Sequence, residues 1–527
     1  MPRGRDALTL KEICLGVIVR NFDRIWTHLF DKHFADVPRL LYVVGPFDNL
    51  PGQLCQDIVH ALMKQRVLRK SHLQLLLLPQ VTHLDFSGAS ATTVSAQALD
   101  ILSVRCKNLV SLNLTSCTSL SPGAINQCLS ALPLLRTLVL KRTKASDPVL
   151  RTIASSLRCL THLDLNACPV TDTGAQLLCG DSGDFEPLCS GLTILDISAT
   201  KIGLSGCSSI IHSFPKLRYL SFADTIEAVA LLHQEKADRS AVVNGVVRTR
   251  SSASVGNTSL GKCASAGSTD LHQLQTLHAT ALKCKNVSPD SVRIACAHCP
   301  SAREVYFYQN ATDAALQHLS CLEQIAVVEV TSDQPGEVTF HHGLLPLLQT
   351  RGDGIVSLGL YDMQDVDVGK IGVLCAHLQR LKLVSMYEDA DFAHTYIPVQ
   401  QLASAFSCLK QLTVVIGPDD TRLRKEDLEH LLLNAHSLQE LHFINVQGIT
   451  DDLLVSALSL HGFSSLRSLQ LESCNHITNN SLLQLVNSSN PLSQLMVKQC
   501  AMVSYQDYQH LQREVTREHL ELSTEWQ

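Results

Sequence analysis

The sequence has no hydrophobic run long enough to cross a lipid bilayer. Its longest apolar stretch, LQLLLLPQV at 73–81, is well short of the ~20 apolar residues that a membrane-spanning helix needs. The first ten residues, MPRGRDALTL, lack the apolar segment of a secretory signal. We therefore expect a soluble chain, cytoplasmic or nuclear, with no membrane partner.

Charge is also scarce. Charged residues make up 17% of the chain and hydrophobic residues 45%, and the formal net charge is -6. No segment is dense in lysine or arginine, so the sequence carries no electrostatic footprint for a polyanion. We expect no nucleic-acid partner.

The sequence motifs of common catalytic sites are missing as well. No phosphate-binding loop, dinucleotide fingerprint or serine nucleophile elbow occurs. The segment CAHC at 296–299 has no matching second pair at zinc-finger spacing. We therefore expect no catalytic residue, no metal and no cofactor, and the function class that remains is binding.

What the chain does contain is a repeat. From about Val81 the pattern L-x-x-L-x-L recurs at roughly 26-residue spacing, which is typical of leucine-rich repeats. Examples are LVSLNLTSC from Leu109, LTHLDLNAC from Leu160 and LRSLQLESC from Leu466. The alternating leucines predict a short strand, and the residues after it have helical periodicity. The fold class expected is an α/β leucine-rich-repeat solenoid, a horseshoe preceded by a helical segment.

Composition divides the chain further. The stretch from Lys236 to Asp270 is rich in serine, glycine and alanine, so it is expected to stay disordered. The domains predicted are a helical segment at 1–80, repeats at 81–235, a disordered insert at 236–270, repeats at 271–505, and a helical cap or tail at 506–527.

The 19 cysteines recur at repeat positions, which indicates packing roles and not one tuned nucleophile. One group is expected just past the strands: Cys117, Cys168, Cys474 and Cys500. A second group is expected at the ends of the repeat helices: Cys106, Cys159, Cys299, Cys321 and Cys408.

A short amphipathic helix is predicted near the amino terminus. Thr9 and Glu12 form a capping box, so the helix should begin at Leu10. Leu10, Cys14 and Ile18 then share one face, with Val17 and Phe22 beside them. By periodicity alone, this face would pack on the first repeats as a solenoid cap.

The residues on that face match a known motif. The segment TLKEICLGVI resembles the elongin-binding box of the von Hippel–Lindau protein and related receptors of cullin ubiquitin ligases: a leucine, a cysteine four residues later and an aliphatic residue four after that. The resemblance implies that Leu10, Cys14, Val17 and Ile18 bind elongin C, which acts together with elongin B.

A second segment, LPGQLCQDI at 50–58, is similar to the cullin-2 box of that family. Leu50, Pro51, Leu54 and Ile58 match its positions, and Gln53 stands where the cullin-5 form has a proline. The resemblance implies cullin-2 and its RING subunit as partners. The separation between the boxes is similar to that in leucine-rich-repeat receptors of cullin-2, such as PRAME and the Zyg and Zer proteins.

Two alternatives stay open. LPGQLCQDIVHAL also resembles the first helix of an F-box, which would make the chain a receptor of a cullin-1 ligase, although the following residues do not supply the rest of an F-box. A leucine-rich-repeat scaffold with no ligase role is the other alternative.

If the chain is a substrate receptor, an unknown protein substrate should bind the concave, strand-lined face. Outward-facing strand residues alternate with the leucines, and tyrosine and arginine are favoured in recognition surfaces. The substrate-binding residues predicted are His162, Asp164, Tyr219, His278, Tyr306, Tyr308, Tyr361 and Arg380.

Overall fold

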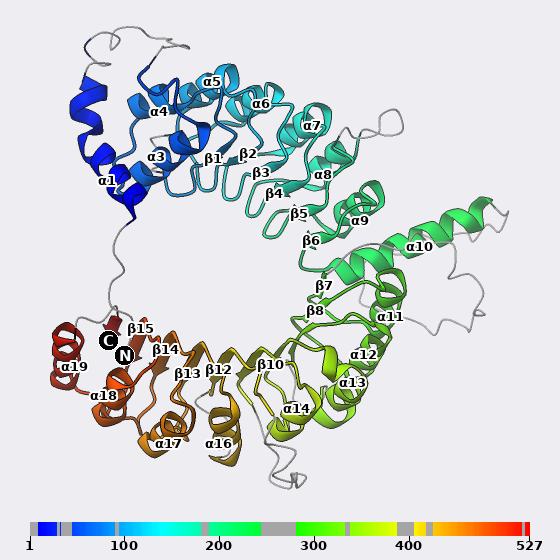
Figure 1. Ribbon diagram of the computed structural model, residues 1–527. Helices are drawn as coiled ribbons and strands as arrows, with labels where there is room; N and C mark the ends of the chain where they lie inside the picture. The colour runs from blue at the N-terminus through cyan, green and yellow to red at the C-terminus, as the bar shows by residue number, and fades with distance from the viewer. Residues whose placement is uncertain are drawn as a thin grey trace. The chain divides into compact units, whose positions relative to one another are not determined.

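The computed structural model describes residues 9–28, 32, 45–89, 94–180, 189–243, 281–332, 338–386, 405–417, 425–518 and 522–527, without the side chains of 238–243. The chain forms two compact units (Figure 1). The N-terminal unit contains Leu8–Ala281 and Ala297–Cys299, and the C-terminal unit contains Leu282–Cys296 and Pro300–Gln527.

The N-terminal unit begins with helices and continues as strand–helix repeats. The opening segment consists of α1 (Leu10–Phe22), a π-helical turn (Asp23–Thr27), α3 (Gly52–Lys64) and α4 (Lys70–Leu76). Six parallel strands follow in sequence order: β1 (His83–Asp85), β2 (Ser111–Asn113), β3 (Thr137–Val139), β4 (His162–Asp164), β5 (Ile194–Asp196) and β6 (Tyr219–Ser221). The helices between and after them are α5 (Ala96–Arg105), α6 (Pro122–Ser130), α7 (Asp147–Ser156), α8 (Asp172–Cys179), α9 (Leu204–Ser213) and α10 (Thr225–Val243).

The C-terminal unit has a ten-stranded parallel sheet, again in sequence order. Its strands are β7 (Ala281–Cys284), β8 (Glu304–Phe307), β9 (Val327–Thr331), β10 (Ser357–Tyr361), β11 (Arg380–Val384), β12 (Gln411–Val415), β13 (Glu440–Ile444), β14 (Ser468–Glu472), β15 (Gln494–Lys498) and β16 (Ser523–Trp526). The helices are α11 (Pro289–His298), α12 (Asp313–His318), α13 (Leu345–Arg351), α14 (Val368–Leu374), α16 (Lys425–Asn434), α17 (Asp451–His461), α18 (Asn479–Asn487) and α19 (Tyr505–Arg517).

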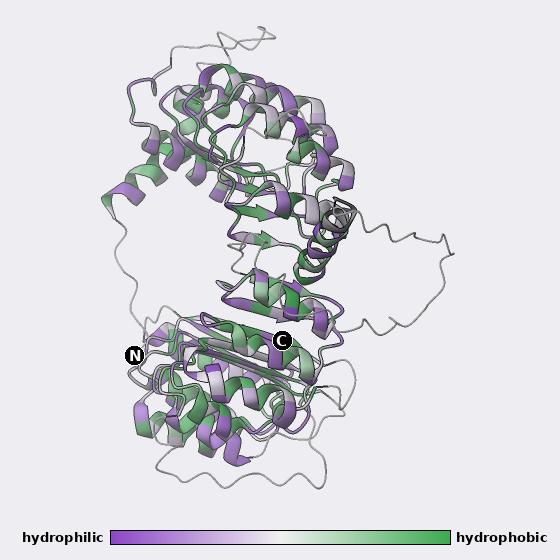
Figure 2. Cartoon of the chain, turned by 90° about the vertical axis from the view of Figure 1, so that its right-hand side faces the viewer, coloured by the Kyte–Doolittle hydropathy of each residue, from purple (hydrophilic) through white to green (hydrophobic). Residues whose placement is uncertain are grey.

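The leucines of the repeat pattern build the core of each unit. In β4 the middle residue, Leu163, is fully buried, while His162 and Asp164 face outward. Successive strands pair in register, so these leucines stack from repeat to repeat, as Leu138, Leu163 and Leu195 do. In each unit the strands line one side and the helices cover the other (Figure 1). Figure 2 shows the strands mainly in hydrophobic colours and the helices two-sided. The predicted leucine-rich-repeat solenoid is confirmed.

A lateral hydrogen-bond ladder joins the starts of the repeat helices. The backbone N–H of Thr171 donates to Asp147 Oδ1 at 2.8 Å, and its hydroxyl donates to Asp147 Oδ2 at 2.7 Å. Thr339 binds Asp313 in the same way, and Thr478 binds Asp451. The aspartate opens one helix and the threonine precedes the next one, so each rung ties two repeats together.

The first group of cysteines lies where the sequence predicts. Cys117, Cys168, Cys474 and Cys500 are all buried just past a strand. Each follows a residue with positive φ, such as Ala167 at 55°, which turns the chain inward. The Cys168 thiol donates to the carbonyl of Leu140 in the preceding repeat at 2.9 Å.

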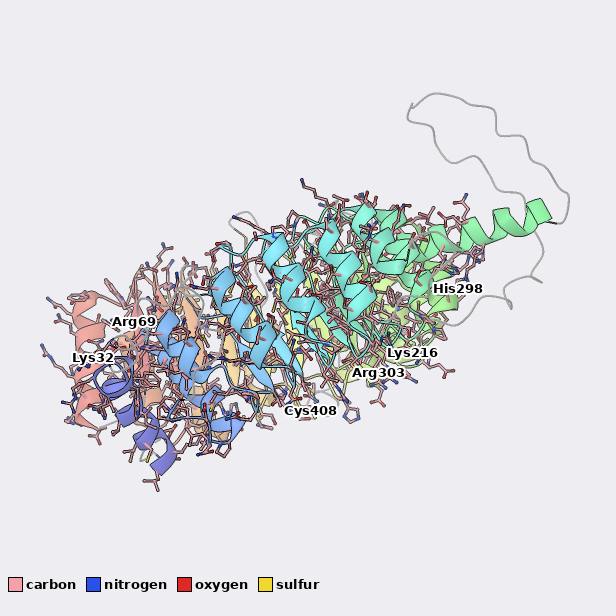
Figure 3. All side chains as sticks on the ribbon, turned by 90° about the horizontal axis from the view of Figure 1, so that it is seen from above. Lys32, Arg69, Lys216, His298, Arg303 and Cys408 are labelled. Atoms are coloured by element: carbon pink, nitrogen blue, oxygen red, sulfur yellow. The ribbon has the colours of Figure 1, made fainter. Side chains whose placement is uncertain are left out.

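The second group needs a correction, because it occupies two positions and not one. Cys106 and Cys299 are fully buried, whereas Cys159 and Cys321 are exposed and Cys408 (Figure 3) is half-buried. The exposed ones stand one residue before a buried leucine, Leu160 or Leu322, in the segment that leads to the strand. The buried ones stand three residues before the equivalent apolar residue, Leu109 or Ala302. At Cys321, a hydrogen bond with the Cys296 thiol lowers the pKa to about 7.

Two predicted boundaries also differ. Helix α10 continues to Val243, so residues 236–243 are helical although the sequence predicts a disordered insert from Lys236. Glu235, Lys236 and Ala237, at the predicted boundary, are good helix formers. The remaining insert residues, 244–270, lie outside the described residues. In the predicted helical tail, β16 is a strand that pairs with β15.

Candidate partner-docking site on the N-terminal helices

Helix α1 begins where the sequence predicts. The backbone N–H of Thr9 donates to Glu12 Oε2 at 2.8 Å, and the backbone N–H of Glu12 donates to Thr9 Oγ1 at 3.2 Å. These two bonds form the capping box. The backbone and hydroxyl of Thr9, both hydrogen-bonded to the carboxylate, lower the pKa of Glu12. The helix start is therefore fixed by its own sequence.

The helix has two apolar faces. One is buried against the rest of the unit, and the other is exposed. Leu10 is 77% exposed, Ile13 and Val17 are each 47% exposed, and Cys14 is exposed as well. These four residues, spaced i, i+3, i+4 and i+7, form one stripe. We call them the α1 outer face. Three of them belong to the predicted elongin-binding set.

The exposed residues of α1 differ from the predicted set at Ile18 and Ile13. Ile18, the fourth predicted residue, is half-buried at the edge of the outer face. Ile13 is exposed within the outer face but was missed, because the box pattern passes over it. Its i+3 spacing from Leu10 was the available signal.

The opposite face of α1 is anchored in an aromatic cluster. Phe22 is fully buried, and its ring centroid lies 5.2 Å from Trp26, 5.4 Å from Phe47 and 4.8 Å from the ring of His72. Val19, at 6% exposure, shares this buried side. Since the helix is held by these residues, the outer face is not needed to seal the solenoid end.

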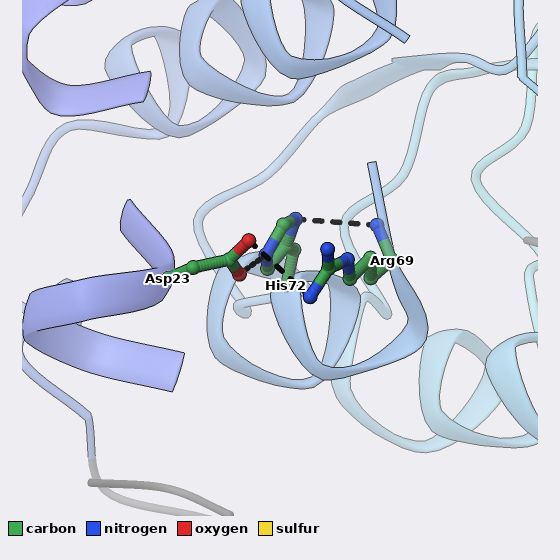
Figure 4. A network of polar contacts seen from close by, with 3 residues as sticks. All are labelled: Asp23, Arg69 and His72. Carbon is green, nitrogen blue, oxygen red and sulfur yellow. Dashed lines mark hydrogen bonds and ion pairs between the residues drawn. The ribbon is translucent and has the colours of Figure 1, made fainter. Parts of the chain in front are cut away.

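A polar network fixes the same junction (Figure 4). The Nδ1 atom of His72 accepts a hydrogen bond from the backbone N–H of Arg69 at 3.2 Å, so Nε2 carries the proton. His72 Nε2 lies 2.7 Å from Asp23 Oδ1, and Arg69 Nη1 lies 3.3 Å from Asp23 Oδ2. Partial burial opposes ionisation of Asp23, but the hydrogen bond from His72 and the charge of Arg69 outweigh it and lower its pKa.

Helix α3 lies beside α1 and has exposed residues of its own at its start (Figure 1). Lys11 Nζ forms an ion pair with Asp57 Oδ2 at 2.6 Å between the two helices. Pro51 immediately precedes α3 and is exposed, and Leu54 is 37% exposed. Leu50 is half-buried. Of the predicted cullin-binding residues, Pro51 and Leu54 are accessible.

The fourth predicted cullin-binding residue, Ile58, needs a correction. It is only 1% exposed and packs inward with Cys55, Val59 and Leu62. The apolar residues of α3 that follow Leu54 pack in the core of the unit. The accessible part of the predicted cullin-2 box is therefore the first turn of the helix.

The strand face of the N-terminal unit holds three of the predicted substrate-binding residues. His162, Asp164 and Tyr219 point outward and are half-buried. Asp164 accepts a hydrogen bond from the backbone N–H of Asn166 at 2.8 Å, which orders the turn after β4. Burial, helped by the negative charge of Asp196 on the next strand, raises the pKa of Asp164. His278 lies outside the described residues.

The other predicted residues lie on the C-terminal unit. The rings of Tyr306 and Tyr308 stack at 6.4 Å, and Lys283 Nζ lies 5.2 Å from the Tyr306 ring centroid. Tyr361 and Arg380 belong to the adjacent strands β10 and β11. The seven predicted substrate-binding residues that the structure describes are therefore divided between the two units, three on the N-terminal unit and four on the C-terminal unit.

The described residues contain no group of three or more histidine, cysteine, aspartate or glutamate side chains placed to hold a metal ion. Among these same residues, no helix combines the length and hydrophobicity that crossing a membrane requires.

Comparison with known proteins supports the repeat. A family model described as "Leucine Rich repeat" matches residues 156–179. Together with the parallel sheets and their alternating helices, this match defines the chain as an α/β leucine-rich-repeat solenoid.

Two solved structures share low similarity with the chain. One is "Crystal structure of Rad7 and Elc1 complex in yeast", at 15% identity and a TM-score of 0.42, covering 95% of this chain and 96% of that one. The other is "Crystal structure of TLR13-ssRNA13 complex", at 13% identity and a TM-score of 0.33, covering 85% and 65%. At these TM-scores, neither likeness indicates what this chain binds.

Proposed function

We propose that the chain is the substrate-recognition subunit of a cullin-2 ubiquitin ligase and that it docks on elongin C, in complex with elongin B, through the α1 outer face. The observation that carries the proposal is the exposure of Leu10 and Cys14 on a helix whose other face already seals the unit. An apolar stripe of this kind, held on an ordered helix, marks a docking surface for another protein.

The residues that anchor α1 differ from those of its outer face, which supports this role. Val19 and Phe22 anchor the helix, and Asp23 fixes its end against α4, so the outer face is presented in one orientation. Presenting a rigid apolar face lowers the entropy cost of binding. The exposed start of the neighbouring helix α3, with Pro51 and Leu54, is the proposed cullin-2 contact.

The proposed mechanism is proximity. The N-terminal helices bind elongin C and cullin-2, a strand face holds the substrate, and the RING subunit of the ligase brings a charged conjugating enzyme close to the substrate's lysines. The chain supplies no catalytic group or cofactor in this scheme, and it acts in the cytoplasm or the nucleus.

Co-elution with purified elongin B–elongin C complex tests the docking step. Wild-type chain is expected to co-elute. The double substitution Leu10→Ser with Cys14→Phe is expected to abolish co-elution, because burial of one leucine contributes about 1.5–3 kcal/mol and the larger ring at position 14 adds a clash. Leu460→Ser is the matched control, since Leu460 is 63% exposed on α17.

A second variant separates the two partners. Leu54→Ser is expected to prevent recruitment of cullin-2 to the complex while elongin binding persists. If the Leu10 and Cys14 double variant co-elutes like wild type, the ligase role fails and a scaffold remains. Co-elution of the wild type with a Skp adaptor, and not with elongin, would instead indicate an F-box receptor.

A further inference from the structure

The strand face of the C-terminal unit carries a row of apolar side chains. Tyr361, Val384, Val415 and Ile444 are paired in register across β10, β11, β12 and β13. All four face outward and are half-buried. The other outward positions of these strands hold only polar or charged residues or glycine: Ser357, Gly359, Arg380, Lys382, Gln411, Thr413, Glu440 and His442. We call the four apolar residues the apolar stripe.

The stripe has a defined extent. At about 4.8 Å between neighbouring strands, four residues span roughly 14 Å. On β14 the equivalent position is Glu472, which ends the stripe on that side. On the other side the register partner of Tyr361 is Thr331 of β9, whose hydroxyl group ends the apolar row there. The apolar residues occupy only one outward position of each strand. The row is therefore a distinct patch on the strand face.

Positive charge lies directly beside the stripe. Arg380 and Lys382 are the charged outward residues on β10, β11 and β12, and no acidic residue occupies an outward position there. The acid on the next strand, Glu440, accepts a hydrogen bond from Gln411 at 3.0 Å. On the other side, Glu329 holds an outward position on β9 and is the register partner of Gly359. Between these flanking acids, this part of the face combines apolar surface with the positive charges of Arg380 and Lys382.

The Tyr361 ring is fixed where these two features meet. Lys382 Nζ lies 4.8 Å from its ring centroid, on the ring face. A Cβ atom at Gly359 would lie 2.9 Å from Glu329 Cγ and 3.4 Å from a carbon of the Tyr361 ring, so the absence of a side chain there lets the ring lie back along its strand. An aromatic anchor already held in place loses little entropy when a partner covers it.

We propose that the apolar stripe, with Arg380 and Lys382, is the docking site for a peptide segment of a protein partner that combines apolar and acidic side chains. The apolar residues of the segment cover the stripe, and a carboxylate meets the two cations on β11. This inference gives the substrate class of the proposed ligase receptor, and only its role in recruitment depends on that function.

A panel of three labelled nine-residue peptides tests the site without any ligase component. The peptides share alternating leucines and differ in the intervening residues, which are glutamate, glutamine or lysine. Fluorescence anisotropy with the full chain is expected to give a dissociation constant about tenfold lower for the glutamate peptide than for the lysine peptide, as expected when a desolvated charge pair replaces a like-charge contact.

Two variants assign that binding to the stripe. Val415→Thr with Ile444→Thr keeps the β-branched shapes and is expected to weaken binding of the glutamate peptide about tenfold by removing apolar contact. Arg380→Gln with Lys382→Gln is expected to erase the difference between the glutamate and lysine peptides. Gln494→Ala, on β15 outside the stripe, is the control, and circular dichroism verifies the fold of every variant.

Equal affinities for the three peptides, no binding of any peptide, or binding unchanged in the folded stripe variants would overturn the inference. Because elongins are absent from this measurement, its failure would leave the docking role of α1 standing. Failure of elongin binding would equally leave the stripe standing.

Discussion

At Asp23, a single carboxylate connects the end of α1 to α4. It accepts from His72 and pairs with Arg69, while the neighbouring Phe22 packs on the His72 ring. Asp23 lies outside the elongin-box pattern, yet it determines how the box residues are presented. The residues proposed to bind elongin C and the residues that orient the helix are therefore different residues of the same short segment.

The ionisation of Asp23 gives a prediction. Its pKa is lowered from the ordinary value of 3.8, so its stabilising contribution is present above that pH and is lost as the pH falls through the lowered pKa. Below about pH 4 the α1 junction is expected to loosen, before the repeats unfold. Trp26 reports the change by fluorescence in a Trp526→Phe background, because it packs against Phe22 and Phe47.

Two variants check the assignment. Asp23→Asn is expected to lose this acid transition and to show the loosened Trp26 signal already at neutral pH. Asp57→Asn removes a carboxylate from the neighbouring α3 and is expected to keep the transition. An identical acid titration in Asp23→Asn and wild type would contradict the role assigned to Asp23.

At the scale of elements, an aspartate at the start of one repeat helix positions the next helix in several repeats. Asp147, Asp172 and Asp313 extend over the first turn of the next helix, where Gly174, Gly206 and Gly343 leave room for the carboxylate. In the repeat after α17, that position is Ser481, whose hydroxyl donates to Asp451. The position thus accepts either no side chain or a hydrogen-bond donor.

Substitutions at this position have a predictable order. Gly174→Ala places a methyl group against Asp147 and is expected to destabilise the chain by about 1–3 kcal/mol through overpacking. Gly174→Ser is expected to cost less, because its hydroxyl can donate as that of Ser481 does. Gly123→Ala on α6 has open space around its Cβ and is expected to stabilise by about 0.5 kcal/mol.

Urea denaturation midpoints measure these three effects. The two alanine variants form a matched pair, since both glycines lie in the first turn of a repeat helix. Stabilisation by Gly174→Ala of the same size as that by Gly123→Ala would mean that the close approach of Asp147 is not a constraint.

At the scale of the whole molecule, the chain divides into two units with separate parallel sheets. The α1 outer face belongs to the N-terminal unit and the apolar stripe to the C-terminal unit. Each has its own core and its own presenting elements, so the two surfaces should act as independent modules.

Independence is measurable in a double-mutant cycle. The Leu10→Ser with Cys14→Phe variant is expected to bind the glutamate peptide as wild type does. The Val415→Thr with Ile444→Thr variant is expected to bind elongin B–elongin C as wild type does. The combined variant should bind the glutamate peptide with the same free energy as the Val415→Thr with Ile444→Thr variant alone, within about 0.5 kcal/mol, as measured by anisotropy. A larger interaction energy would show that the two units are coupled.

The repeat architecture was predictable because its signal is local and periodic. Alternating leucines specify strands, and their recurrence specifies stacking, so the sheet order follows from the sequence order. The burial of individual residues was less predictable. Ile58 and Leu54 stand on the same short helix in the same apolar pattern, and only packing against the first repeats separates core from surface. The stripe was partly missed because Val384, Val415 and Ile444 have the composition of ordinary strand residues.

Local sequence was sufficient to predict the α/β repeat, the capped start of α1 and the buried positions of the cysteines that follow the strands, because each depends on neighbours close in the chain. The folded structure was needed to show which face of α1 is exposed, that Ile58 is a core residue, and that four apolar side chains from separate repeats form one row. Those outcomes depend on contacts between residues far apart in the chain, which no local pattern encodes.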